Sequence, residues 1–161
     1  MNQEQQRAHF YSLMSTFDVA EQVRLYEEEY YRRKLMGVIH RFDSTDNGEF
    51  RWQDVPLSAY GPDNSRAERA TRQILIGMEE QAPNFHLRYF AVQPGGYTSL
   101  DQHAHDHGVY ILHGKARLRL DDEEHEVYPG DVVYIGGNEI HQFFTTGEEP
   151  FGFLCVVPAK R

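Results

Sequence analysis

Short strand-like runs separated by turn residues constrain the fold of this chain more than any other feature. Between Thr71 and Val157, runs rich in β-branched and aromatic residues recur with no helical period between them. The runs are Gln73 to Gly77, Leu87 to Val92, Val109 to Leu112, Ala116 to Leu120, Val132 to Ile135, Gln142 to Phe144 and Phe153 to Val157. Strands at this spacing predict an all-β domain, built as an antiparallel sandwich or barrel.

Turn-forming residues punctuate these runs. Pro94-Gly95-Gly96, Pro129-Gly130 and Gly136-Gly137-Asn138 each lie between two of the expected strands. Glycine and asparagine tolerate the backbone angles of tight turns, and proline interrupts a strand ladder. We therefore expect each of these three clusters to be a turn between strands.

The N-terminal part of the chain has a different pattern. Asp18 and Glu21 have capping-box spacing, and Val19, Val23, Tyr26 and Tyr30 then recur at helical intervals. This predicts a helix from about residue 16 to 36. We expect residues 1–70 to form a helical extension with a linker or edge strands, and residues 71–161 to form the β-barrel domain.

The segment from Asp43 to Asp54 partly matches a calcium-binding EF-hand loop. It has Asp54 where such a loop needs a bidentate glutamate, and Pro56 would break the helix that should follow. Asn47-Gly48 suits a tight turn. The segment is therefore interpreted as a loop without calcium.

Histidines gather in the second half of the chain. Asp101, His103, His105 and His107 occupy alternate positions, and His141 follows after a second strand-rich run. Alternate side chains of a strand share one face, so we expect these residues to converge. Several imidazoles at one place favour a metal ion as the group that holds them together.

The two histidine regions resemble the motifs of the cupin superfamily. Gly95, Asp101, His103, His107 and Gly114 fall on the first motif, G-x5-H-x-H-x3-4-E-x6-G, without a gap. Gly130, Gly136, Asn138, His141 and Thr145 occupy the places of the second motif, G-x5-P-x-G-x2-H-x3-N, with Gly136, Asn138 and Thr145 replacing the family's proline, glycine and asparagine. The resemblance covers residues 71 to 158 and implies a jelly-roll barrel with a metal site.

The resemblance implies His103, His107 and His141 as ligands of one divalent metal ion. Asp101 stands at the family's first histidine and His107 at its glutamate, so the usual three histidines and one carboxylate are kept if Asp101 binds. A rival alignment pairs His103 with His105 and gives a four-histidine site. Asp101 and His105 are therefore alternative fourth ligands.

Imidazole and carboxylate donors suit Fe, Mn, Ni or Zn and do not select among them. Val109, Ile111 and Phe143 share strand parity with the ligands, which predicts an apolar pocket for a small organic molecule. We expect a metal-dependent dioxygenase or related oxidoreductase. The alternatives are a sugar or keto-acid isomerase and a non-catalytic ligand-binding or sensing module. No catalytic residue is assigned, although Tyr110, Tyr134 and Arg88 lie near the expected ligands in sequence or across strands.

Charge and composition narrow the partners. A formal net charge of -9 argues against a nucleic acid or an anionic membrane as partner. Cys155 is the single cysteine, so no intrachain disulfide can form, and no apolar run approaches the ~18 residues of a membrane span. We expect a cytoplasmic protein that acts on a small molecule. Tyr26, Tyr30 and Tyr31 leave an aromatic helix face that favours a homodimer.

Overall fold

The computed structural model describes residues 21, 24–25, 27–28, 37–61 and 67–159. The chain divides into two compact units, Met1–Val38 and Ile39–Arg161. The unit that contains the strands thus begins well before the boundary at residue 70 that we expected from the sequence. Among the described residues, no helix is long and apolar enough to cross a membrane.

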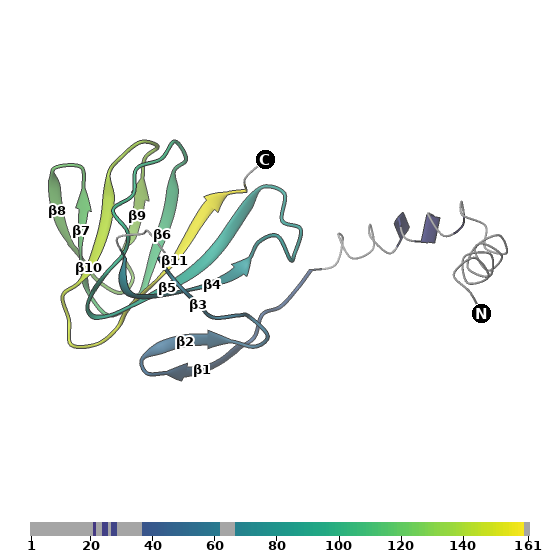
Figure 1. Cartoon of the computed structure of the whole chain (residues 1–161), viewed down its shortest axis with the longest axis horizontal. Helices are drawn as coiled ribbons and strands as arrows, with labels where there is room; N and C mark the ends of the chain where they lie inside the picture. The colour runs from purple at the N-terminus through teal and green to yellow at the C-terminus, as the bar shows by residue number, and fades with distance from the viewer. Residues whose placement is uncertain (1–20, 22–23, 26, 29–36, 62–66, 160–161) are drawn as a thin grey trace, which may run out of the picture. The chain divides into compact units, whose positions relative to one another are not determined.

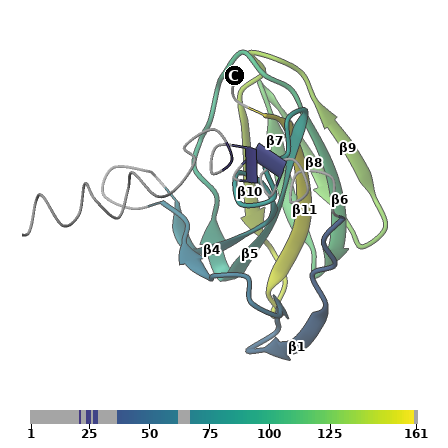
Figure 2. The same cartoon turned by 90° about the vertical axis from the view of Figure 1, so that its right-hand side faces the viewer.

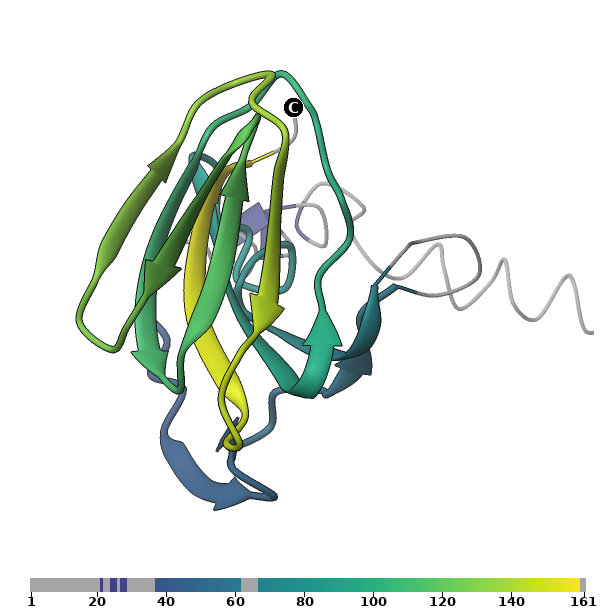
Figure 3. The ribbon, with the colours of Figure 1, turned by 90° about the vertical axis from the view of Figure 1, so that its left-hand side faces the viewer.

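The second unit is built from antiparallel strands (Figure 1). The strands are β1 (Phe42–Asp46), β2 (Glu49–Trp52), β3 (Ser58–Ala59), β4 (Glu68–Ile76), β5 (Phe85–Tyr97), β6 (His107–His113), β7 (Ala116–Leu120), β8 (Glu123–Val127), β9 (Val132–Ile135), β10 (His141–Thr145) and β11 (Phe151–Pro158). The main sheet has the order β8-β7-β10-β5-β11-β6-β9, with β4 on β5 and β3 on β4. The two side views, each turned by 90° from the view of Figure 1, show that this sheet curls around its inner face (Figure 2, Figure 3). The all-β antiparallel fold predicted from the sequence is confirmed.

Strand β5 connects the two parts of the curled sheet. Its first half pairs with β4 and β11, and Tyr97 at its end pairs with Phe144 of β10. Between Val92 and Tyr97 the register against β4 shifts, and this irregular segment contains Pro94, Gly95 and Gly96. Gly95 has φ +74°, which a side-chain-bearing residue adopts at a cost. The expectation of a turn at 94–96 is therefore wrong: these residues form a bulge inside one long strand, which redirects it toward a new partner.

The inner face of the sheet carries the larger core. Phe143, Phe151 and Phe153 stack on one another with ring centroids 4.7 to 5.6 Å apart. Ile111 and Leu118 from β6 and β7 are buried in the same cluster. Burial of this apolar layer fixes which face of the strands that carry the site points inward.

A hairpin covers the outer face of β5. Strands β1 and β2 meet at Asn47-Gly48, both of which have positive φ, and Phe50 of β2 stacks on Tyr89 with ring centroids 6.0 Å apart. The backbone N–H of Phe50 donates to the Tyr89 hydroxyl at 3.0 Å. The turn was expected from the sequence, but its flanking strands were interpreted as loop. The polar residues of β1 and β2 hide the strand pattern in the sequence. Their packing against Tyr89 depends on β5, which is distant in the chain.

The predicted helix over residues 16–36 lies mostly outside the described residues. Glu21, Arg24, Leu25, Glu27 and Glu28 are helical, and the remaining positions are not described. No helix is among the elements of the described chain, so the helical extension stays a prediction.

Replacing Gly114 by alanine should destabilise the fold more than replacing Gly130. Both glycines have left-handed backbones, at φ +68° and +96°, which cost a side-chain-bearing residue about 1–2 kcal/mol. At Gly114 an added Cβ would also overlap the carbonyl oxygen of Pro150 and lie 2.8 Å from Cα of Phe151, whereas nothing lies within 4 Å at Gly130. Urea unfolding should show the larger loss for Gly114→Ala. Equal losses would show that the close approach at Pro150 does not limit stability.

Candidate metal centre

The histidine-rich stretch is a loop, not a strand. Asp101 forms one isolated bridge with His141, residues 102–106 have no regular structure, and His107 is the first residue of β6. The expectation that 101, 103, 105 and 107 share the face of one strand is therefore wrong. No partner strand runs along this loop, so its backbone bonds locally to the segment that leads into β10.

Backbone contacts hold this loop against the start of β10. The N–H of Asp101 donates to the carbonyl of His141 at 3.1 Å, and the reverse bond measures 2.9 Å. The N–H of Asn138 donates to the carbonyl of His103 at 2.6 Å. Gly137 lies so close to the carbonyl of Ala104 that a Cβ there would overlap it. The glycine that was expected as a turn residue thus also permits the loop to pack.

The loop brings the three predicted ligands together despite its irregular backbone. One ring nitrogen from each of His103, His107 and His141 lies within 4.8 Å of the others. The ring of His105 stacks on that of His103, with centroids 3.7 Å apart and planes inclined by 5°. We call His103, His107 and His141 the histidine cluster.

Two members of the cluster are oriented by their other ring nitrogen. Nδ1 of His103 donates to the carbonyl of His105 at 2.9 Å, and Nδ1 of His141 donates to the carbonyl of Glu139 at 2.9 Å. A carbonyl only accepts, so Nδ1 carries the proton and Nε2 keeps a free lone pair. This is the arrangement that metal-binding histidines commonly have.

His107 completes the case for a metal. Its Nε2 is buried and has no hydrogen-bond partner in the described structure. Burial, followed by the neighbouring charges of His141 and Arg88, lowers the pKa of His107 to about 3. The imidazole is therefore neutral and can act as a ligand. The unpartnered Nε2 of His107 lies beside the Nε2 atoms of His103 and His141. Three such nitrogens together fit a divalent ion.

The rival fourth ligands have different surroundings. Asp101 accepts hydrogen bonds at Oδ2 from Ser99 Oγ at 2.6 Å and from the Tyr60 hydroxyl at 3.1 Å. His105 packs against the rings of His103 and His107. The group of ring nitrogens within 4.8 Å includes neither residue, so the choice between them stays a prediction.

A cavity of about 380 Å³ opens beside the cluster. Phenylalanines from three strands form much of its wall, namely Phe90, Phe143 and Phe153. Its volume lies in the range of small-molecule sites. The apolar pocket expected from the sequence is present, with Val109 and Ile111 buried in the core that adjoins it.

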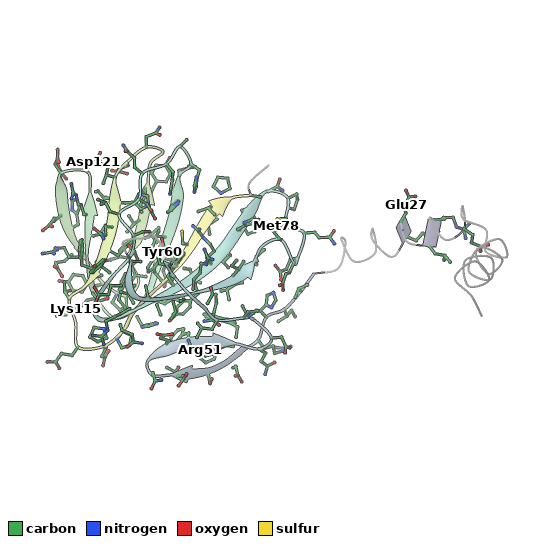
Figure 4. The ribbon with its side chains drawn as sticks, viewed as in Figure 1. Glu27, Arg51, Tyr60, Met78, Lys115 and Asp121 are labelled. Atoms are coloured by element: carbon green, nitrogen blue, oxygen red, sulfur yellow. The ribbon has the colours of Figure 1, made fainter. Side chains whose placement is uncertain are left out.

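Sequence reasoning missed several polar residues of the cavity. Tyr60, His86 and Cys155 line it together with Arg88, which was one of three residues considered without a role. Tyr60 lies inside the curled sheet (Figure 4), packed against the core. Cys155 lies on β11, which pairs with both β5 and β6, and its thiol lines the cavity. The other two residues considered, Tyr110 and Tyr134, are exposed instead.

Burial sets the protonation of two of these groups. Burial raises the pKa of Tyr60 to about 12, opposed by its hydrogen bond with Ser99 and reinforced by the charge of Asp101. Burial also raises the pKa of the Cys155 thiol, and the nearby Arg88 partly offsets this. At neutral pH the cavity therefore contains a protonated phenol and a protonated thiol.

Known proteins share this architecture. A family model described as "Cupin domain" matches residues 88–157. A Rhodospirillum rubrum protein named 1-methylthio-D-xylulose 5-phosphate methylsulfurylase is 40% identical over 114 residues, which cover 70% of this chain and 72% of that protein. A solved cupin-2 domain from the same organism is 37% identical, covers 74% of this chain and 79% of its own, and has a TM-score of 0.65. The polyketide cyclase RemF from Streptomyces resistomycificus is 31% identical over 79% of this chain and 82% of its own, with a TM-score of 0.63. Fold, motif register and sequence identity agree, and the chain belongs to the cupin superfamily.

Proposed function

We propose that this protein is a metal-dependent enzyme that acts on a small carbonyl or enol compound. The observation that carries the proposal is the histidine cluster, in which one ring nitrogen from each of three imidazoles lies at the cavity and the buried Nε2 of His107 has no hydrogen-bond partner in the described structure. His103, His107 and His141 hold the ion, with Asp101 or His105 as fourth ligand. A divalent ion supplied there polarises a bound oxygen, and Fe, Mn, Ni and Zn all suit this donor set.

Tyr60 is suited to hold or donate a proton in this cavity. Its hydroxyl lies 2.5 Å from Ser99 Oγ and 3.1 Å from Asp101 Oδ2. Because its raised pKa keeps it protonated, Tyr60 can turn its one O–H from Asp101 to a substrate oxygen as negative charge develops there. Ser99 and Asp101 orient the hydroxyl, and burial together with the charge of Asp101 keeps it protonated.

The names of two relatives favour a carbonyl compound as the substrate. The Rhodospirillum rubrum relative is named for a ketose phosphate, and the Streptomyces relative for the cyclisation of a polyketide. Both names describe carbonyl-bearing substrates. A metal that polarises the carbonyl, with Tyr60 as proton donor, suits isomerisation or a related rearrangement.

Dioxygenation is the second candidate reaction, and it is the one first expected from the sequence. Three or four protein ligands leave coordination positions open on a six-coordinate ion, and a non-haem iron site uses such positions for dioxygen. The remaining alternative is a non-catalytic binding or sensing module, which would use the same cavity without turnover.

Replacing His141 by alanine should abolish stoichiometric metal binding. This residue is the one that ties the β10 segment to the loop of His103 and His107, and its loss leaves two imidazoles. Metal content should be measured by elemental analysis after loading with Fe, Mn, Ni or Zn. The matched control His125→Ala removes an exposed histidine of β8 and should leave the metal content unchanged. Full metal in His141→Ala would contradict the proposed site.

The same assay ranks the two rival ligands. Asp101→Ala should weaken metal binding, while His105→Ala should leave it nearly intact, because the gapless motif alignment places Asp101 at a ligand position. The reverse order would show that a four-histidine site is correct. Asp101→Asn separates the two roles of this residue, since it keeps the side-chain size and one acceptor oxygen for Ser99 and Tyr60 while removing the charge.

Oxygen uptake should separate the candidate reactions. We expect the metal-loaded protein to convert small hydroxyketones or their phosphates without consuming dioxygen, as followed by proton NMR and an oxygen electrode. Tyr60→Phe should lower kcat by roughly 10²- to 10⁴-fold, the usual contribution of a positioned proton donor, with the metal content unchanged. Stoichiometric oxygen consumption would establish the dioxygenase instead. Binding of these compounds without turnover or oxygen uptake would favour the binding module.

We also propose that the protein acts in the cytoplasm as a homodimer. An apolar patch lies on the outer side of β6, β9 and β11, where paired registers bring together Tyr110, Val132, Tyr134 and Val156. Their exposed fractions range from 41% to 77%. Such a patch on a small domain favours cover by a second copy.

Changing Val132 to aspartate should therefore convert a dimer into a monomer, because a charge buried in an apolar interface is costly. Light scattering at micromolar concentration measures this mass. Met78 is similarly exposed but lies outside the patch, so Met78→Asp is the matched control and should stay dimeric. A wild-type protein of monomer mass would contradict the proposal.

A further inference from the structure

Arg88 and His86 lie side by side on the cavity face of β5. Alternate residues of this strand, His86, Arg88 and Phe90, all line the cavity. Their partners across β11 are Val157, Cys155 and Phe153, which line it as well. The two basic side chains thus stand on a continuous, mostly apolar wall formed by two paired strands.

Within the residues that the structure describes, neither of these two side chains has a carboxylate partner. In the described part of the chain, no carboxylate lies within ion-pair distance of Arg88, whose guanidinium donates to Cys155 Sγ at 3.2 Å and lies 5.2 Å from the Phe90 ring centroid. The buried atoms Nε of Arg88 and Nε2 of His86 have no hydrogen-bond partner. By contrast, Arg51 pairs with Glu49 at 2.9 Å. Asp101, the carboxylate of the cavity, is engaged by Ser99 and Tyr60.

Two buried ring and guanidinium nitrogens without partners in one wall are costly unless a ligand meets them. The half-buried charge of Arg88 loses part of its hydration without compensation, and a chain with 25 acidic residues and 16 basic ones has carboxylates to spare. A guanidinium offers a planar fork that matches a phosphate or a carboxylate. The missing partner at this wall is therefore an anion.

The distance to the histidine cluster suits one small molecule. Arg88 pairs with Cys155, which pairs with Val109 of β6, and His107 is two residues from Val109 on the same strand. Two strand spacings across and two residues along place the Cα atoms of Arg88 and His107 roughly 12 Å apart. Both side chains reach into the cavity between them, which shortens the gap to be bridged.

We propose that Arg88 and His86 form an anion subsite, which binds a phosphate or carboxylate of the substrate while its carbonyl oxygens lie at the histidine cluster. This inference rests on the proposed function and narrows its substrate class. The substrates are small carbonyl compounds with an anionic group at some distance from the reacting carbonyl. Neutral polyketide-like compounds and simple ketones would leave the subsite empty.

Calorimetry on the metal-loaded protein tests this with matched ligands. Dihydroxyacetone phosphate and dihydroxyacetone present the same hydroxyketone with and without a phosphate. We expect the phosphate to bind at least about tenfold more tightly, the gain of a charge-assisted pair. A second pair, 2-oxoglutarate against 2-oxopentanoate, replaces the phosphate by a distal carboxylate. The pair with the larger ratio identifies which anion the subsite takes.

Arg88→Gln should reduce either ratio to less than about twofold and leave both the metal content and the affinity for dihydroxyacetone unchanged. Arg119→Gln, on β7 and outside the cavity, is the matched control and should keep the full ratio. His86→Asn should partly lower the ratio of affinities between the anionic ligand and its matched counterpart. No anion preference in the wild type, or a preference that survives in Arg88→Gln, would overturn the subsite.

Competition gives a readout that needs no variant. Inorganic phosphate should weaken the binding of dihydroxyacetone phosphate to the wild type and leave dihydroxyacetone unaffected. Equal weakening of both ligands would place phosphate on the metal and overturn the subsite. Elemental analysis of the same samples separates the two proposals: absence of metal defeats the proposed function, whereas a loaded protein without anion preference defeats the subsite alone.

Discussion

One pair of backbone hydrogen bonds, between Asp101 and His141, is the constraint on which the site depends. It joins an irregular loop to the first residue of β10 and so brings two distant parts of the chain into register. The side chains of His103 and His141 then find carbonyl partners for Nδ1 within their own segments. Without this bridge, the loop would have no strand to position it, because residues 102–106 form no ladder.

The sheet contributes the other half of the geometry. His107 begins β6, so its ring is directed by a strand that pairs with β11 on one side and β9 on the other. The bulge at residues 93–96 lets β5 contact β4, β11 and β10 in turn. The site lies between β6 and a loop that is bonded to β10. This arrangement keeps the ring nitrogens of the histidine cluster close together and leaves the side that faces the cavity open.

Much of this was visible in the sequence, and the exceptions have physical reasons. Local alternation of apolar residues gave the positions of β5, β6, β7, β9, β10 and β11, and motif spacing brought out the three histidines. The strand β8 has the sequence EEHEV, whose exposed polar residues carry no apolar alternation. Tyr60 and His86 have no motif, and their place in the cavity depends on pairing between segments far apart in the chain. Spacing alone could not distinguish a histidine strand from a histidine loop, because the path of the loop is set by its contacts with residues 137–141, far along the chain.

The polar groups of the cavity fall into three sets that lie on different parts of the chain, and this has a consequence for how such a protein can diversify. The histidines belong to the loop, β6 and β10, the basic pair to β5, and Tyr60 to the short segment after β3, which precedes the region matched by the family model. Exchange of that segment would alter the proposed proton chemistry while the histidine cluster stayed intact. Substitution of the basic pair on β5 would alter the charge of the accepted molecule and leave both the histidine cluster and Tyr60 unchanged. One barrel can thus acquire new substrates and new reactions along independent evolutionary paths.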